Sequence, residues 1–108
     1  MQNLASLQQA LRDLTLQGAL IEAMWMPRLE EFKPQMIFIS AGFDAHREDD
    51  LGQLGLVEAD YEWITQRVKA VADRHARGRI VSCLEGGYAL GALARSVAVH
   101  LRVLADMG

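Results

Sequence analysis

The chain has 108 residues, 51% of them hydrophobic, which fits one globular domain with a core of its own. Eleven basic and fourteen acidic residues give a formal net charge of −3 and form no basic stripe, which argues against direct nucleic-acid binding. No apolar run approaches the length of a membrane span and the N-terminus lacks a secretory signal pattern, so we expect a cytoplasmic protein without membrane contact.

The first 34 residues predict two helices. Pro27 is expected near a helix start or at a kink, and Pro34 disfavours helix at the residue before it and so ends this part. The apolar residues at helical spacing are Leu4, Leu7, Leu11 and Leu14 in the first helix and Ile21, Met24, Trp25, Leu29 and Phe32 in the second.

Two short apolar runs, 36–40 and 79–84, predict strands of a parallel sheet covered on both faces, because neither alternates with polar residues. The single cysteine, Cys83, lies in the second run, and we expect it to be a small buried hydrophobe rather than a nucleophile or disulfide partner. Residues 41–56 show no sustained period and predict a long loop, which in so small a domain is usually functional or disordered.

Helices are predicted from Glu58 to about Arg77 and from Leu90 to Leu104. The order helix, strand, loop, helix, strand, turn, helix contains the strand–helix–strand unit of a parallel α/β sheet, whose crossover is almost always right-handed. The turns after the two strands therefore emerge at one carboxyl edge, where open α/β folds bind ligands.

The turn after the first strand carries Asp44 and His46. A carboxylate just past a strand end can be a metal ligand, a general base or a turn cap, and capping is the commonest role of an isolated aspartate. If the chain stays extended, His46 lies on the same side and the pair could hold a metal. Two ligands are too few for a catalytic zinc, and His75 and His100 lie in helical segments, where packing or solvation is the commoner role.

The turn after the second strand reads Glu85-Gly86-Gly87-Tyr88. Paired glycines mark turns by supplying positive φ or close backbone approach. A phosphate-binding loop is a weaker alternative, because the glycines lack dinucleotide-binding spacing and no Lys-Ser/Thr pair follows. Tyr88 either packs on the sheet rim or reaches a cleft, where its hydroxyl could donate to a developing oxyanion.

Three separated runs, in this order, resemble the zinc-dependent histone deacetylase family. The likeness is to its class II and bacterial members, which include the histone deacetylase-like amidohydrolases and acetylpolyamine amidohydrolases. It extends from about Leu20 through the last helix and implies the C-terminal portion of a three-layer α/β/α arginase/deacetylase-like fold. The runs are 38–46 (FISAGFDAH), 49–54 (DDLGQL) and 84–88 (LEGGY).

The resemblance implies hydrolysis of an acetylated amine, acetyl-lysine or acetylpolyamine, with zinc as the cofactor. It implies that Asp44 is a zinc ligand and that Tyr88 hydrogen-bonds the acetyl carbonyl and stabilises the tetrahedral oxyanion. The resemblance implies no metal-ligand role for His46. The residues expected to shape the pocket are Gly42, Phe43, His46, Glu85, Gly86 and Gly87.

The family's paired catalytic histidines and its Asp-x-His zinc-binding segment lie upstream of the matched part. We therefore expect residues 1–108 to be a single partial domain, the C-terminal third of a deacetylase-like domain, and inactive as the isolated chain. Val57 stands where relatives often have a threonine or serine that caps the helix.

The rival interpretation is a non-catalytic oligomerising or interaction module derived from that fold. An unpaired strand edge and uncovered apolar helix faces favour association with another chain. We expect a homo-oligomer, with the N-terminal leucine stripe as a candidate contact, or a complex with a complementary N-terminal deacetylase segment.

Overall fold

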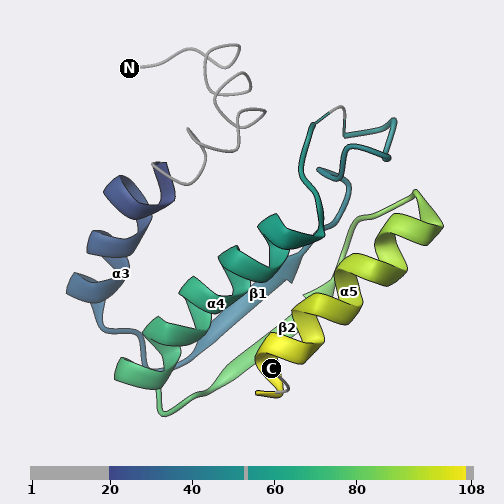
Figure 1. Cartoon of the computed structure of the whole chain (residues 1–108). Helices are drawn as coiled ribbons and strands as arrows, with labels where there is room; N and C mark the ends of the chain where they lie inside the picture. The colour runs from purple at the N-terminus through teal and green to yellow at the C-terminus, as the bar shows by residue number, and fades with distance from the viewer. Residues whose placement is uncertain (1–19, 53, 107–108) are drawn as a thin grey trace.

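The computed structural model describes residues 20–52 and 54–106, and the helix predicted around Leu4–Leu14 lies outside them. The elements follow the predicted order (Figure 1). No helix of the described part is both long and apolar enough to cross a bilayer. The elements are η1 (Ile21–Trp25), α3 (Met26–Phe32), β1 (Ile37–Ala41), α4 (Glu58–His75), β2 (Ile80–Leu84) and α5 (Leu90–Leu104).

The two strands form a parallel pair, with register from Ile37 opposite Ile80 to Ala41 opposite Leu84. The helix α4 connects them, so the predicted strand–helix–strand unit is confirmed. This parallel arrangement brings the carboxyl ends of both strands to the same edge of the sheet.

Both long helices cover the same face of the sheet (Figure 1). On the β1 side, Ile37 packs against a cluster that includes Val71 of α4. On the β2 side, the Ser82 hydroxyl lies 2.8 Å from Nε2 of His100 on α5. The α/β class is therefore confirmed, and the described residues form two layers, one of strands and one of helices.

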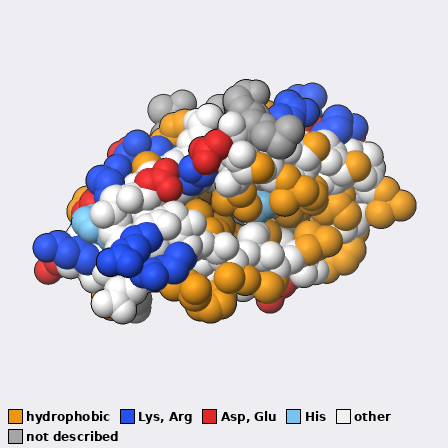
Figure 2. Space-filling view, turned by 90° about the horizontal axis from the view of Figure 1, so that it is seen from below, with side chains coloured by type: hydrophobic (Ala, Val, Ile, Leu, Met, Phe, Trp, Pro, Cys, Tyr) orange, Lys and Arg blue, Asp and Glu red, His pale blue; other side chains and the backbone are white. Residues whose placement is uncertain are grey.

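The opposite face of the sheet is uncovered in the described part of the chain, so the expectation of strands covered on both faces is wrong there. Phe38 is 72% exposed and Val81 40% exposed, because alternate side chains of each strand point away from the helices. Cys83 shares this alternation and is exposed rather than buried. Figure 2, seen from below, shows hydrophobic side chains gathered over part of the surface, apart from a cluster of lysine and arginine side chains.

The N-terminal segment packs on α4 through fewer residues than predicted. Ile21 and Met26 are buried against Val71. Three other apolar residues of the predicted face are exposed, because they point away from α4: Met24, Trp25 and Phe32. Pro27 lies in the first turn of α3, directly after the π-helical turn η1, so it marks the point where the geometry of a continuous helical stretch changes.

Candidate functional site

The turns that follow β1 and β2 are hydrogen-bonded to one another. The Glu85 backbone N–H donates to the Ala41 carbonyl at 2.9 Å, and the Phe43 N–H donates to the Gly86 carbonyl at 2.9 Å. The parallel pairing thus continues beyond the strands. The sequence predicted that these turns emerge together, and the backbone confirms it.

The Asp44 carboxylate lies against Gly86 of the second turn. A Cβ added at Gly86 would lie 3.3 Å from Oδ1 and 3.4 Å from Oδ2 of Asp44, tighter than ordinary contact. Gly52 packs on the backbone of the same residue, since a Cβ at Gly52 would lie only 1.7 Å from the backbone carbonyl oxygen of Asp44. No hydrogen bond to this carboxylate is present among residues 20–52 and 54–106.

Phe43 anchors the first turn from beneath. Its side chain is buried, with its ring centroid 5.0 Å from that of Tyr61 and 5.7 Å from that of His100. Burial raises the pKa of Tyr61, and the negative charge of Asp44 acts in the same direction. Phe43 therefore affects the site by holding the first turn against the buried core.

His46 is fully buried and faces α4. Its Nδ1 accepts the backbone N–H of Glu48 at 3.1 Å, so Nε2 carries a proton and donates to Oε1 of Glu58 at 3.1 Å. Both ring nitrogens are used in this way. The alternative in which His46 joins Asp44 as a metal ligand is therefore not supported, and the residue fixes the long loop to the start of α4.

The group His46, Glu48 and Glu58 brings its donor atoms within 4.8 Å of one another. Arg95 of α5 already binds both carboxylates, with Nε 2.7 Å from Oε1 of Glu58 and Nη2 on Glu48. The Arg95 guanidinium and the His46 ring hold the pKa of the Glu58 carboxyl at about 2. We conclude that this group is an ion-pair network that orders the loop, because a metal would have to displace Arg95.

The second turn depends on Gly87. Its φ is +137°, and an added Cβ would lie 2.7 Å from Cδ1 of Leu93. Both functions expected of paired glycines, positive φ and close approach, are thus present at one residue. The next residue, Tyr88, is 57% exposed, so its phenol projects from the turn rather than packing in the core.

The other two sequence-predicted pocket residues, Gly42 and Glu85, are exposed at this edge. Glu85 joins the turns through its backbone N–H. An added Cβ at Gly42 would make ordinary contact, 3.4 Å from Oδ1 of Asp44. Gly42 therefore lies beside the carboxylate, whereas Glu85 contributes a backbone bond between the two turns.

Sequence reasoning missed Asp49. This residue is 3% exposed, and its Oδ2 accepts the Tyr88 backbone N–H at 2.7 Å. It belongs to one of the recognised runs, but nothing in the run distinguishes it from its exposed neighbour Asp50. Its contact partner is 39 residues away, so no local spacing signals the bond.

The helical histidines serve packing, as expected. Thr65 donates to the Tyr61 carbonyl at 2.6 Å and lies 2.9 Å from Nδ1 of His100, whose Nε2 lies 2.8 Å from the Ser82 hydroxyl. This chain of bonds joins α4, α5 and β2, and burial lowers the pKa of His100. His75 pairs with Glu30 of α3.

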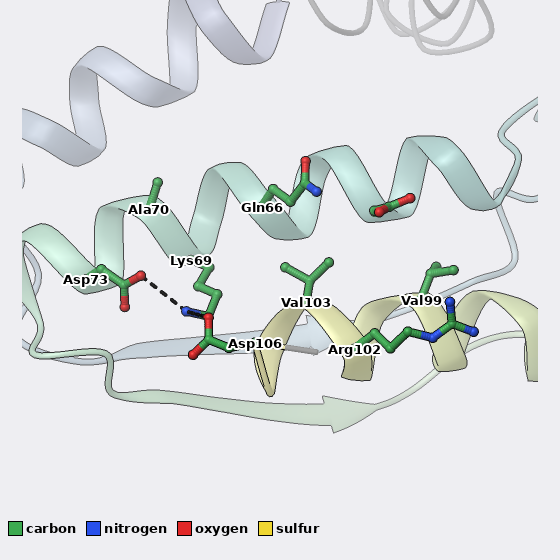
Figure 3. Close-up of a pocket in the computed structure, with 9 residues that line it drawn as sticks. Gln66, Lys69, Ala70, Asp73, Val99, Arg102, Val103 and Asp106 are labelled. Atoms are coloured by element: carbon green, nitrogen blue, oxygen red, sulfur yellow. Dashed lines mark hydrogen bonds and ion pairs between the residues drawn. The ribbon is translucent and has the colours of Figure 1, made fainter. Parts of the chain in front are cut away.

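A groove of about 370 Å³ runs between α4 and α5 (Figure 3). Lys69, in the groove, is paired with two acids, since its Nζ lies 3.2 Å from Asp73 and 2.6 Å from Asp106. These residues lie toward the C-terminal ends of the helices, whereas the two turns adjoin the N-terminal ends. The groove therefore shares no residue with the candidate site.

Comparison with known proteins gives one consistent result. A family model described as the histone deacetylase domain matches residues 3–104. The chain is 46% identical over 96 residues to Type-2 histone deacetylase 2 of Dictyostelium discoideum, covering 82% of this chain and 6% of the relative. It is 43% identical over 63 residues to the Histone deacetylase-like amidohydrolase of Pseudomonas aeruginosa, covering 58% of this chain and 17% of the relative.

Solved structures agree. The HDA15 HD domain superimposes with a TM-score of 0.74 at 32% identity, covering 81% of this chain and 24% of that chain. The histone deacetylase Clr3 gives a TM-score of 0.73 at 32% identity, covering 82% and 14%. The chain thus spans a quarter or less of the length of these proteins, and the family-model match over residues 3–104 includes both turns of the candidate site.

Proposed function

This chain belongs to the histone deacetylase family, and on that premise we propose that it supplies part of the active site of a zinc-dependent deacetylase. One observation carries the proposal. The Phe43–Gly86 hydrogen bond and the Asp44 carboxylate against Gly86 bring an acid and the turn of Tyr88 to one edge of the sheet. We propose an acetylated amine, acetyl-lysine or acetylpolyamine, as the substrate.

Asp44 fits the role of one zinc ligand. Its carboxylate lies close to Gly86 and Gly42, which carry no side chains, and it accepts no hydrogen bond in the described part of the chain. A catalytic zinc usually takes three protein ligands, so further ligands must come from outside these residues. When bound, zinc polarises the carbonyl and lowers the pKa of water.

Tyr88 fits the role of an oxyanion donor. Its side chain is exposed on a turn that is hydrogen-bonded to the turn of Asp44, so its hydroxyl is accessible to a substrate carbonyl at this edge. Because Gly86 has no side chain, its backbone can lie close to the Asp44 carboxylate. We propose that residues 1–108 act as a single partial domain and do not turn over substrate alone.

The partner we propose is a complementary N-terminal deacetylase segment that covers the exposed sheet face. That face presents Phe38 and Val81, and the chain covers only 24% of a solved deacetylase chain of the same fold. The second candidate function is a non-catalytic module in which another copy covers the same face. Light scattering separates them: a stable monomer at high concentration contradicts the module.

Two assays test the catalytic proposal. The purified chain is expected to show no turnover of a fluorogenic acetyl-lysine substrate, and turnover abolished by Asp44→Ala would overturn that expectation. In the second assay, a hybrid enzyme is made in which a segment of this chain replaces the matching segment of the Pseudomonas aeruginosa amidohydrolase. In an active hybrid, Asp44→Ala is expected to remove bound zinc, and Tyr88→Phe to lower kcat by about 10²- to 10³-fold.

The remote aromatic Phe32, 78% exposed on α3, supplies the control. Phe32→Leu should leave kcat of the hybrid within about twofold, because exposed side chains away from the site contribute little. A Tyr88→Phe hybrid as active as the Phe32→Leu hybrid would refute the role of the phenol.

A further inference from the structure

We propose that Asp49 is a positioning residue, which fixes the backbone of Tyr88 and thereby the aim of its hydroxyl. The inference rests on the role proposed for Tyr88. Asp49 lies on the loop after β1, 39 residues before Tyr88 in sequence, and its carboxylate is directly bonded to the turn after β2. No side chain of the first loop other than Asp49 forms a hydrogen bond to the Tyr88 backbone within residues 20–52 and 54–106.

Both oxygens of the Asp49 carboxylate accept hydrogen bonds from the backbone. Oδ2 accepts the N–H groups of Tyr88 at 2.7 Å and Ala89 at 3.3 Å, whereas Oδ1 accepts the N–H of Leu51 at 2.9 Å. The side chain is nearly fully buried, so water does not compete for these bonds. Asp49 is thus held by its own loop while it holds the second turn.

The second turn needs such an external contact. Two glycines precede Tyr88, and glycine restricts the backbone least of all residues. The helix α5 begins after Ala89, whose side chain cannot cap it. A negative charge at this end is favourable to the helix dipole, and the hydrogen bond from Tyr88 lowers the pKa of Asp49, which keeps it charged.

Positioning has a catalytic consequence that fold stabilisation lacks. An oxyanion donor is effective only when its hydroxyl is already placed where charge develops. If Asp49 provides that placement, its loss should lower kcat with little change in KM. Its loss should also have no effect once the Tyr88 hydroxyl is gone.

The first test needs no catalysis. Amide hydrogen exchange is measured by NMR on the ¹⁵N-labelled full chain, with Asp49→Ala compared to Asp50→Ala, a change at the exposed neighbour. Asp49→Ala is expected to speed exchange at Tyr88 and Ala89 by about tenfold or more, while β1 and α4 amides keep their rates. Unchanged exchange at Tyr88, or equal acceleration everywhere, overturns the proposal.

Asp49→Asn keeps the size of the side chain and covers the case in which the alanine variant does not fold. Its carbonyl oxygen still accepts one N–H but carries no charge, so exchange at Tyr88 should lie between wild type and alanine. An asparagine variant whose Tyr88 amide exchanges at the wild-type rate also counts against the proposal.

The second test uses the hybrid enzyme and a double-mutant cycle. Asp49→Ala is expected to lower kcat about tenfold when Tyr88 is present and less than twofold in the Tyr88→Phe background. Equal losses in both backgrounds would mean a structural role only. If the hybrid with an intact segment is inactive, the proposed function fails, while the exchange experiment still decides whether Asp49 fixes the turn.

Discussion

The two turns at the carboxyl edge of the sheet are fixed by opposite means. The turn after β1 is held by side chains: a buried His46 bonded to Glu58, which Arg95 binds from α5. The turn after β2 has no side chains at Gly86 and Gly87, so its backbone packs closely on Asp44 and Leu93 and is held from outside by the Asp49 carboxylate. The comparison teaches that one turn tolerates conservative changes that preserve polar contacts, whereas the other tolerates no added atom.

The largest effect is expected at Gly87. Gly87→Ala places a Cβ 2.7 Å from Cδ1 of Leu93 at a φ of +137°, so both strain and overpacking act. We expect a loss of about 3 kcal/mol or more in the free energy of unfolding, measured by urea denaturation.

Gly91→Ala is the matched control for the second turn. There the nearest atom is the flexible end of Arg95, at 3.3 Å, and the residue is helical. We expect no loss, and a gain of up to about 1 kcal/mol from helix propensity. Equal destabilisation by both alanines would mean that the turn is no more constrained than the helix.

The first turn should respond next most strongly, to His46→Ala. The change removes a fully buried ring and leaves the Glu48 N–H without its acceptor. We expect a loss of about 2–4 kcal/mol in unfolding free energy. Arg47→Ala, at the exposed next position, is the control and should change it by about 0.5 kcal/mol or less.

The sequence predicted the parallel unit because its cues are local. Each strand is a short apolar run that ends at glycine or glutamate, and α4 has a strong helical period. The uncovered face of the sheet was not predicted, because the sequence shows an apolar residue such as Phe38 in the same way whether or not a layer covers it. The hydrogen bond between the Tyr88 N–H and the Asp49 carboxylate could not be predicted either, because a buried acid in a loop follows no periodic sequence pattern.

The network of the first turn also predicts a dependence on pH. Arg95 and His46 lower the pKa of Glu58 from 4.5 to about 2, so the unfolded chain binds the proton more readily than the folded chain. The stability from Glu58 is therefore complete above about pH 4.5 and is lost as the pH falls toward 2.

Urea unfolding of wild type and Glu58→Gln between pH 7 and pH 2 checks this dependence. The difference in unfolding free energy between wild type and Glu58→Gln should shrink as the pH falls from 4.5 to 2. Glu62→Gln, one turn further along α4 and exposed, is the control and should follow the wild type. A wild-type to Glu58→Gln difference that stays constant with pH would contradict the ion-pair account.

The smallest effect is a gain at the junction of the first loop and α4, where Val57 is the N-cap. Its backbone has the extended geometry that a capping residue needs, with φ −126° and ψ 175°, but its side chain cannot accept a hydrogen bond. Asp60 already accepts the Val57 N–H at 2.8 Å, which is one half of a capping box. Val57→Thr keeps the β-branched shape and completes the box by adding a side-chain acceptor for the Asp60 N–H, which already donates to the Val57 carbonyl at 2.9 Å. We expect about 1 kcal/mol of added stability in urea unfolding, and Val57→Ala, which adds no acceptor, should give none. A threonine variant no more stable than wild type would show that the polar network, rather than the cap, determines how the first loop enters the helix.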